Sequence, residues 1–238
     1  AFGSNGGRAF ETTSKRVGAR FRAASRTNPY VGRSRWQYCC VRGRVATGEG
    51  DSAFEGLLSQ LREEMALTVA RVMTAEPDYL VMGMSAETFW GGVEGNREFR
   101  RQISELSDVG LATGAEACER ALKRLNIHRI GVVTPYQPIG DENVVKFFTE
   151  MGFDVVAVKG LKCPTPGSIA EVDEATLRQA LQEVNSDRMD VLVQAGTNLS
   201  MVRLADEAER WLNKPVIAVN AATWWMALRD NGIDDKLQ

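Results

Sequence analysis

The sequence has few of the residues that bind metals or carry out thiol and imidazole chemistry. Its 238 residues include one histidine and four cysteines. No two cysteines have the Cys-x-x-Cys spacing, so the sequence offers no zinc site, and we expect free, buried thiols. The histidine precedes a predicted strand and is expected at the surface, which argues against a Ser-His-Asp triad. These residues are Cys39, Cys40, Cys118, Cys163 and His128.

The sequence also lacks a long apolar run, a signal-peptide pattern and a Gly-x-Gly-x-x-Gly phosphate loop. No apolar stretch approaches the roughly 20 residues of a membrane span. The apolar content of 44% and the charged content of 25% are typical of soluble globular proteins. The pair Gly91-Gly92 is interpreted as a flexible turn. We therefore expect a cytoplasmic protein that does not bind a membrane.

Charge is distributed unevenly along the chain. Residues 1–45 contain ten basic residues and one acidic residue, whereas the chain as a whole has a net charge of −2. Residues 1–50 as a whole have no helical or strand pattern, which leaves two interpretations: a mobile basic extension, or a misread segment of the gene. It has no recognisable nucleic-acid motif, so no nucleic-acid partner is predicted.

From residue 51 onward, strand-like and helical patterns alternate with short links. Apolar runs predict strands at 79–83, 109–112, 129–134, 154–158, 191–195 and 215–219. Helical spacing predicts helices from near Ser52, and at 96–106, 115–125, 142–151, 168–172, 174–184, 201–212 and 221–230. Residues 85–92 are expected to form a loop. This alternation indicates an α/β fold with parallel sheets and right-handed crossovers.

Two of the predicted strands resemble each other. Residues 78–85 and 190–197 both start with Asp, continue as an aliphatic run and reach a hydroxyl at the same step, Ser85 or Thr197. Ligands of parallel sheets bind at the carboxyl ends of strands. The pattern therefore suggests a site built from two related halves, although an ordinary pair of core strands would look the same.

Several motifs in combination resemble the maleate isomerase and arylmalonate decarboxylase family of the aspartate/glutamate racemase superfamily. Residues 133–136 (Val-Thr-Pro-Tyr) are similar to its Thr-Pro-Tyr motif, and residues 196–199 (Gly-Thr-Asn-Leu) to its Cys-Thr-Asn-Leu motif. Residues 214–224 match its Lys-Pro-Val segment, with Asn and Ala-Thr-x-Trp following. Residues 83–89 stand where the family has a Gly-Cys-Thr-Ser type of loop.

The resemblance implies two pseudo-symmetric Rossmann-like halves with the active site in the cleft between them. The first half would comprise residues 51–112 plus 221–238, and the second residues 113–220. A small carboxylic acid would be the substrate, no cofactor or metal would be needed, and the chain would form a homo-oligomer as family members commonly do.

The resemblance also implies roles for individual residues. Ser85 and Thr88 would belong to one carboxylate-binding loop, and the Tyr136 phenol would donate to the carboxylate. The second loop would contribute backbone N–H groups, and Asn220 would lie near the other end of the substrate. That second loop comprises Gly196, Thr197, Asn198 and Leu199.

The chain departs from the family at both positions where cysteines act. Met84 and Gly196 stand there, and neither can form a thiolate. Decarboxylation of a malonate-type acid demands less than isomerisation or racemisation: preorganised donors hold the enediolate and a proton is supplied at the end. Glu87 is the candidate for that proton, and its alternative roles are a solvated loop acid or a helix cap. Cys163 lies in a loop that we expect to stay away from the cleft.

Three functions remain open. The first is a cofactor-independent lyase that uses Ser85, Tyr136, Thr197 and Asn198 to stabilise an enediolate, with Glu87 moving the proton. The second is a maleate cis-trans isomerase with an unrecognised nucleophile. The third is a carboxylate-binding protein without catalytic activity.

Overall fold

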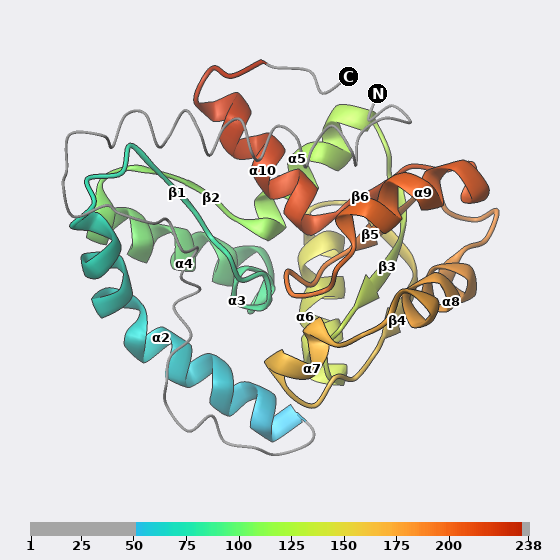
Figure 1. The fold of residues 1–238 in the computed structure, drawn as a ribbon, viewed down its shortest axis with the longest axis horizontal. Helices are drawn as coiled ribbons and strands as arrows, with labels where there is room; N and C mark the ends of the chain where they lie inside the picture. The colour runs from blue at the N-terminus through green and yellow to red at the C-terminus, as the bar shows by residue number, and fades with distance from the viewer. Residues whose placement is uncertain (1–50, 235–238) are drawn as a thin grey trace.

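The larger of two parallel sheets forms from the aliphatic segments of the second half of the chain. The computed structural model describes residues 51–234, except the side chains of residues 53, 54 and 57. The strand order is β4-β3-β5-β6, and every pair is parallel (Figure 1). Each parallel connection needs a crossover, and helices supply them. The strands are β3 (Arg129–Thr134), β4 (Asp154–Gly160), β5 (Val191–Gln194) and β6 (Val216–Ala218).

Helices cover both faces of the larger sheet. The apolar side of α6 places Phe147 and Phe148 in the core, where both are fully buried. Leu177 and Leu204 come from helices that pack against the same sheet and lie in a second apolar cluster. The four helices that follow β3, β4 and β5 in the chain are α6 (Pro138–Glu150), α7 (Pro166–Ala170), α8 (Glu174–Val184) and α9 (Val202–Leu212).

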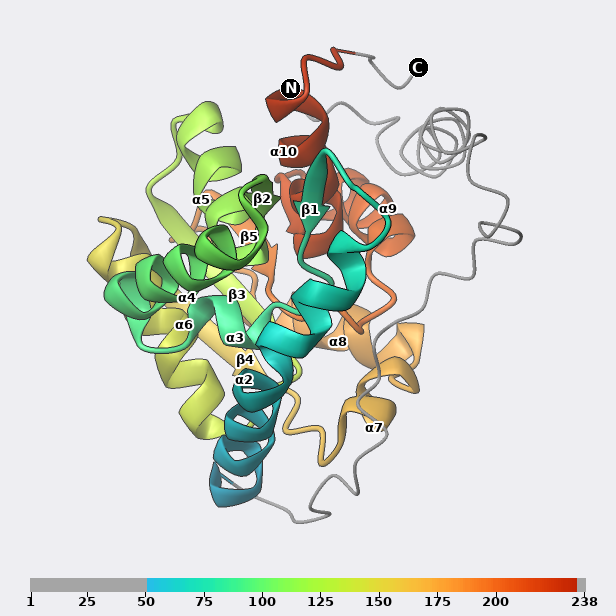
Figure 2. The same cartoon turned by 90° about the vertical axis from the view of Figure 1, so that its left-hand side faces the viewer.

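The smaller sheet has two described strands, β1 (Tyr79–Val81) and β2 (Gly110–Ala112), which pair in parallel. Helix α10 (Val219–Asp230) packs against both strands, and helix α4 (Gly92–Ser107) packs against β2 (Figure 2). Val69, Phe99 and Ile103 form the apolar cluster between this sheet and its outer helices. The remaining elements are α2 (Asp51–Met73), α3 (Ala86–Phe89) and α5 (Gly114–Leu125).

One continuous core joins the parts of the chain that carry the two sheets. Phe89 from α3 is fully buried and meets Phe147 edge to face, with ring centroids 5.4 Å apart. Cys118 from α5 and Met226 from α10 belong to the same cluster. Such edge-to-face pairs add stability beyond the area that they bury. The core therefore holds the smaller sheet firmly against α6 and the larger sheet.

The predicted α/β fold with parallel sheets flanked by helices is confirmed, with local corrections. The segment predicted as a loop at 85–92 contains the short helix α3. Helix α6 begins at Pro138 rather than at residue 142, because proline is well suited to the first turn of a helix. Helix α2 already includes Ser52, and β4 continues to Gly160. The basic segment and Cys39-Cys40 lie outside the described residues.

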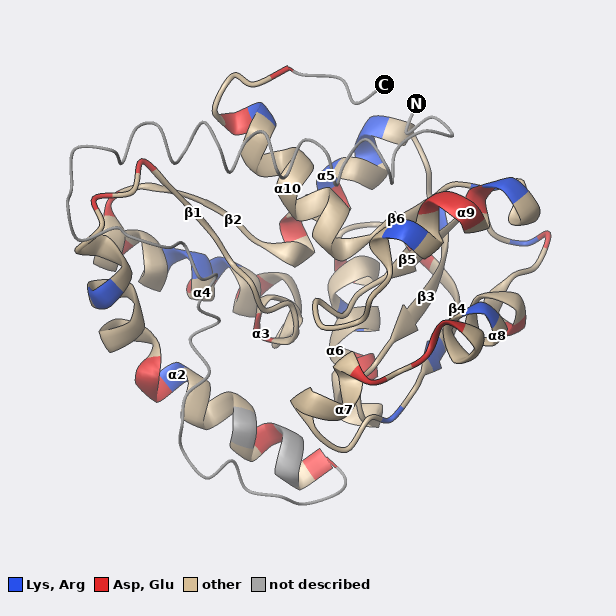
Figure 3. Cartoon of the chain, in the orientation of Figure 1, with Lys and Arg blue, Asp and Glu red and all other residues tan. Residues whose placement is uncertain are grey.

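Charged residues of the described part lie mainly on the outer helices, with both signs interspersed (Figure 3). Arg178 on α8, for example, pairs with Glu174 and with Glu207 on α9. Among residues 51–234, none of the helices combines the length and apolar character needed to cross a membrane.

Candidate functional site

The ends of the two similar strands meet, as predicted. β1 ends at Val81, and Ser85 follows as the residue that precedes helix α3. β5 ends at Gln194, and the chain then turns through Gly196 to Thr197. The Thr197 amide donates a hydrogen bond of 3.0 Å to Ser85 Oγ. Segments more than 100 residues apart in the chain therefore share one site at the carboxyl ends of their strands.

Two hydroxyls and one carbonyl form the centre of this site. Ser85 Oγ and the Tyr136 phenol oxygen are 2.8 Å apart. Both hydroxyls also lie within hydrogen-bond distance of the Ala195 carbonyl, at 2.9 Å from Ser85 and 2.7 Å from Tyr136. Each hydroxyl has a single proton, so only two of these three hydrogen bonds form at one time, and the Ala195 carbonyl accepts from one hydroxyl or from both. A pair of neutral donors aimed at one oxygen is the arrangement that binds a carboxylate or an enediolate oxygen.

Tyr136 enters the site from the turn that follows β3. Its side chain is buried, and burial is the main reason why its pKa is raised well above the ordinary value for tyrosine. The hydrogen bond with Ser85 opposes this rise, and Cys118 adds to it. Tyr136 therefore stays a neutral phenol at physiological pH and acts as a hydrogen-bond donor.

Thr88 lies at the site but uses its hydroxyl to support Ser85. Thr88 Oγ1 donates to the Ser85 carbonyl at 2.7 Å and accepts from the Ala115 amide at 3.2 Å. The side chain is completely buried. Thr88 thus fixes the first turn of α3 against the start of α5 and orients Ser85. Direct binding of a carboxylate by Thr88 stays a prediction.

Side-chain amides fix the second loop. Asn220 Nδ2 donates to the Thr197 carbonyl at 2.8 Å, and Gln194 Nε2 donates to the Gly196 carbonyl at 2.5 Å. With these carbonyls occupied, the loop is held with the Thr197 amide toward Ser85. The sequence gives no sign of this role for Gln194, because the residue follows the aliphatic run of a predicted strand; its burial and its hydrogen bond to the turn reveal it.

Two further predicted residues of this loop face the protein rather than Ser85. Asn198 Nδ2 donates to the Pro166 carbonyl at 3.1 Å, which ties the loop to the start of α7. The Leu199 side chain is buried in the core cluster of the larger sheet, and its amide donates to the Gly196 carbonyl at 3.2 Å. Any contribution of these two residues to a ligand would therefore come from backbone groups.

The positions at which the family resemblance places cysteines differ in their surroundings. Met84 is half-buried and adjoins Ser85. Gly196 lies directly against the ring of Pro135, and a Cβ added to it would overlap the Pro135 Cγ and Cδ atoms. No side chain fits at position 196 while Pro135 keeps its place, because a proline ring cannot swing aside as a flexible side chain does.

Glu87 is buried, and its expected alternatives as a solvated acid or a simple helix cap are wrong. Its side chain has no exposed surface, and Oε1 pairs with Arg62 of α2. Among the described residues, Oε2 has no hydrogen-bond partner. Burial raises the pKa of Glu87, and the Arg62 hydrogen bond and charge offset only part of that rise. The Glu87 side chain pairs with Arg62 rather than with Ser85 or Tyr136, so Glu87 lies near the site only because it follows Ser85 by two residues in the chain.

Neither described thiol is activated. Cys118 is fully buried beside Tyr136, and burial raises its pKa to about 12, so it stays protonated at neutral pH. Burial also raises the pKa of Cys163. The loop of Cys163, expected to stay away from the site, instead lies against its edge: the Cys163 amide donates to the Pro135 carbonyl at 2.9 Å.

Other candidates contribute nothing to the centre of the site. His128 is exposed, as predicted. Phe89 belongs to the aromatic core. Among residues 51–234, no group of three or more His, Cys, Asp and Glu side chains is placed to hold a metal ion.

Replacement of Gly196 tests the close contact with Pro135. We expect Gly196→Ala to lower the free energy of unfolding by about 1–3 kcal/mol, the usual range for inserting atoms into a packed region. Gly83→Ala is the matched control, because a Cβ at Gly83 meets nothing within 4 Å. Its effect should stay within about 0.5 kcal/mol. Urea unfolding of both variants measures the difference, and equal effects would contradict the proposed overlap.

The buried state of Glu87 predicts a pH dependence of stability. A carboxyl whose pKa is raised on folding stabilises the folded state fully below its unfolded pKa, and this contribution is lost as pH rises through the folded pKa. Wild type should therefore gain stability relative to Glu87→Gln when pH falls from 7.5 to 4.5. Thermal unfolding across this range is the measurement. Glu98→Gln is the control, because hydrogen bonding to Arg101 lowers the Glu98 pKa to about 2 and no such gain is expected.

Comparison with known proteins places this geometry in a family. The family model of arylmalonate decarboxylase matches residues 54–238. A maleate isomerase of Pseudomonas putida is 29% identical over 142 residues, which is 58% of this chain and 57% of that protein. The chain thus matches just over half of the length of this curated relative.

Solved structures share the fold. A Nocardia farcinica maleate cis-trans isomerase, determined as a cysteine-to-serine mutant with a covalently bound succinylcysteine intermediate, has a TM-score of 0.71 at 20% identity and covers 75% of each chain. A double mutant of arylmalonate decarboxylase in a liganded form has a TM-score of 0.70 at 21% identity and covers 82% of each chain. With the family model matching most of its length, the chain belongs to the arylmalonate decarboxylase family.

Proposed function

We propose that this protein is a cofactor-independent enzyme that removes CO2 from a small malonate-type acid. The observation that carries the proposal is the buried set of neutral donors at the ends of β1 and β5. Ser85 Oγ and the Tyr136 phenol converge on one oxygen, and the Thr197 amide adjoins them. The relatives include enzymes named for decarboxylation and for isomerisation, and the site chemistry favours the first.

The reaction needs little beyond such donors. When the bond between the α-carbon and the leaving carboxylate breaks, its electron pair passes to the remaining carboxylate and forms an enediolate, while CO2 departs. The donors stabilise the negative charge that develops on the enediolate oxygens. A proton then adds to the α-carbon and yields the monocarboxylate. In the closed site the Ala195 carbonyl occupies the position in which a substrate oxygen would accept these hydrogen bonds.

Thiol chemistry fits this chain less well. Reversible addition of a thiolate to an alkene requires an ionised sulfur at the site. Cys118 is close to Tyr136 but is held protonated by burial, and position 196 has no room for a side chain. Donor-assisted decarboxylation therefore agrees better with the residues that are present.

Glu87 is the proton donor in this proposal. Its raised pKa keeps a larger fraction of the carboxyl protonated near neutral pH than is usual for glutamate. It is two residues from Ser85, and its Oε2 atom is free of hydrogen bonds within the described part of the chain. In this structure the Glu87 carboxyl points to Arg62. Proton transfer therefore requires that substrate binding around Ser85 moves this carboxyl to within reach of the substrate's α-carbon.

Incubation of the purified protein with a panel of substituted malonates tests the proposal. We expect CO2 release, and a loss of about 100- to 1,000-fold in kcat for Ser85→Ala and for Tyr136→Phe, the range seen when one donor to a developing oxyanion is removed. The matched controls are Ser107→Ala and Tyr79→Phe. Each removes a hydroxyl that donates elsewhere: Ser107 to the Ile103 carbonyl, and Tyr79 to the Asp230 carboxylate. Full activity in the Ser85 and Tyr136 variants would contradict the assigned roles.

One observation favours a second function, maleate isomerisation. The Cys163 loop borders the turn that carries Tyr136, and Cys163 is the more exposed of the two described thiols. If Cys163 is a nucleophile, fumarate should form from maleate, and Cys163→Ser should abolish this activity while Cys118→Ala preserves it. Unchanged activity in Cys163→Ser would remove this thiol from the mechanism.

A third outcome is binding without turnover. Calorimetry that detects malonate or maleate binding, with no CO2 and no fumarate produced, would identify a carboxylate-binding protein. Assembly into a homo-oligomer stays a prediction.

A further inference from the structure

The backbone that carries Tyr136 is held from two sides. On one side, the chain after β4 donates three amides: Leu161 to the Thr134 carbonyl at 2.9 Å, Cys163 to Pro135 at 2.9 Å and Lys162 to Tyr136 at 3.1 Å. On the other side, the Tyr136 amide donates to Thr134 Oγ1 at 3.1 Å. The orientation of the phenol therefore depends on where the Thr134 hydroxyl points.

The Thr134 hydroxyl is in turn oriented by Asp141. Thr134 Oγ1 donates its single proton to Asp141 Oδ1. With the proton committed there, a lone pair of the same oxygen remains for the Tyr136 amide. The three groups form a chain of hydrogen bonds that runs from the carboxylate on the first turns of α6 to the residue that supplies the phenol.

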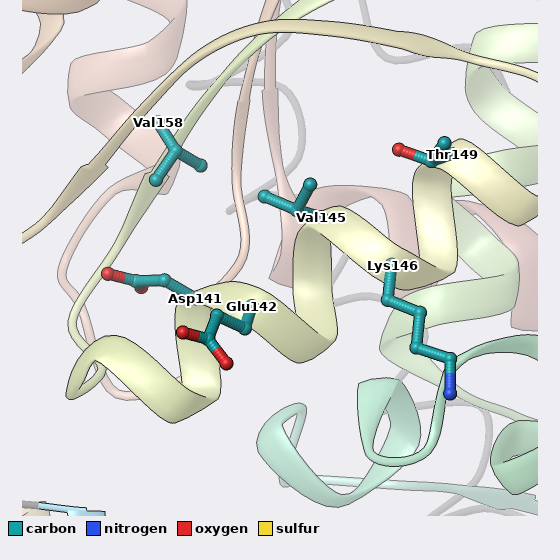
Figure 4. A pocket seen from close by; sticks show the side chains of 6 residues that line it. All are labelled: Asp141, Glu142, Val145, Lys146, Thr149 and Val158. Carbon is teal, nitrogen blue, oxygen red and sulfur yellow. The ribbon is translucent and has the colours of Figure 1, made fainter.

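The surroundings of Asp141 fix its carboxylate in place. A Cβ added at Gly160 would overlap the carboxylate, so the absence of a side chain at the end of β4 makes room for it. Asp141 is buried, and it also borders a surface groove of about 420 Å³. Figure 4 shows Asp141 and its neighbour Glu142 leaving α6 in different directions. The remaining groove residues are Val145, Lys146, Thr149 and Val158.

We propose that Asp141 is a positioning residue for Tyr136 and acts through the Thr134 hydroxyl. The proposal rests on the proposed function in one respect, the use of the Tyr136 phenol to bind a carboxylate. The positioning itself is a property of the unliganded protein and has its own measurement.

The charge on Asp141 sets how strongly this chain of hydrogen bonds holds. Burial raises the pKa of Asp141 to about 6, and the Thr134 hydrogen bond and Lys162 limit the rise. The other charged groups that face it, Asp51 from α2 and Glu142 from α6, raise it. A hydrogen bond to an ionised acceptor is stronger than one to a neutral acceptor. The Thr134 hydroxyl is therefore held more firmly above pH 6 than below it.

Amide exchange measured by NMR tests the positioning without any ligand. In Asp141→Leu and in Thr134→Val, we expect the Tyr136 amide to exchange about 10-fold faster than in wild type at pH 7.5, because one hydrogen bond of ordinary strength is lost. Thr134→Ser keeps the hydroxyl and should restore slow exchange. Glu142→Gln changes the adjacent acid, which has no bond to Thr134, and should leave the rate unchanged. Equal rates in wild type and Thr134→Val would overturn the proposal.

Asp141→Asn separates charge from shape, and it guards against a Leu variant that does not fold. Asparagine can accept the same hydrogen bond but does not ionise. After correction for intrinsic exchange, wild-type protection of the Tyr136 amide should fall as pH is lowered through 6. Protection in Asp141→Asn should match the low-pH wild type and stay flat. A pH dependence that persists in the Asn variant would exclude Asp141 as its source.

A double-mutant cycle with malonate as the probe connects the positioning to binding. Asp141→Asn should weaken malonate binding several-fold in wild type but have no further effect in the Tyr136→Phe background. Independent, additive losses would contradict action through Tyr136. If wild type binds no malonate, the proposed function fails while the exchange experiment still decides the positioning.

Discussion

The hydrogen bond from the Thr197 amide to Ser85 is the contact on which the site depends. It joins the ends of β1 and β5, which belong to different sheets. A buried donor or acceptor left without a partner costs about 1–3 kcal/mol, so the two loops are stable only when they meet. The supports around them serve this meeting: Thr88 orients Ser85, and Asn220 and Gln194 fix the carbonyls of the second loop. The proposed decarboxylation uses this set of donors to hold the enediolate.

Burial then imposes one electrostatic character on the whole region. It raises the pKa values of Tyr136, Glu87, Asp141 and Cys118, and so favours the neutral form of each. Neutral phenol and carboxyl groups donate hydrogen bonds and protons, whereas a neutral thiol is a weak nucleophile. Positive charges act on two of these groups: Arg62, half-exposed on α2, pairs with Glu87, and Lys162 limits the rise at Asp141. The same physical effect therefore supports donor and proton-transfer chemistry and opposes covalent chemistry through sulfur.

Much of the fold could be predicted from the sequence, because aliphatic runs and helical spacing are local signals. β3 was predicted with its observed bounds, and α8 as well. The convergence of Ser85 and Thr197 followed from a similarity between two strands. Three features could not be predicted: the pairing of Glu87 with Arg62, the hydrogen bond from Gln194 to the Gly196 carbonyl, and the contact of Pro135 with Gly196 that leaves no room for a side chain. Each depends on a tertiary contact or on local geometry that no sequence pattern records.

The turn at residues 134–136 has more influence than its length suggests. Its proline ring closes the space beside Gly196, its carbonyl binds the Cys163 amide, and its tyrosine reaches Ser85. A displacement of this turn would therefore change the room at position 196, the place of the Cys163 loop and the donor geometry at the same time. Asp141 holds the turn through the Thr134 hydroxyl, and burial raises the pKa of its carboxyl to about 6. Asp141 does not itself donate to the substrate oxygen, yet through this turn it influences all three features. Asp141 therefore belongs to the functional description of the site.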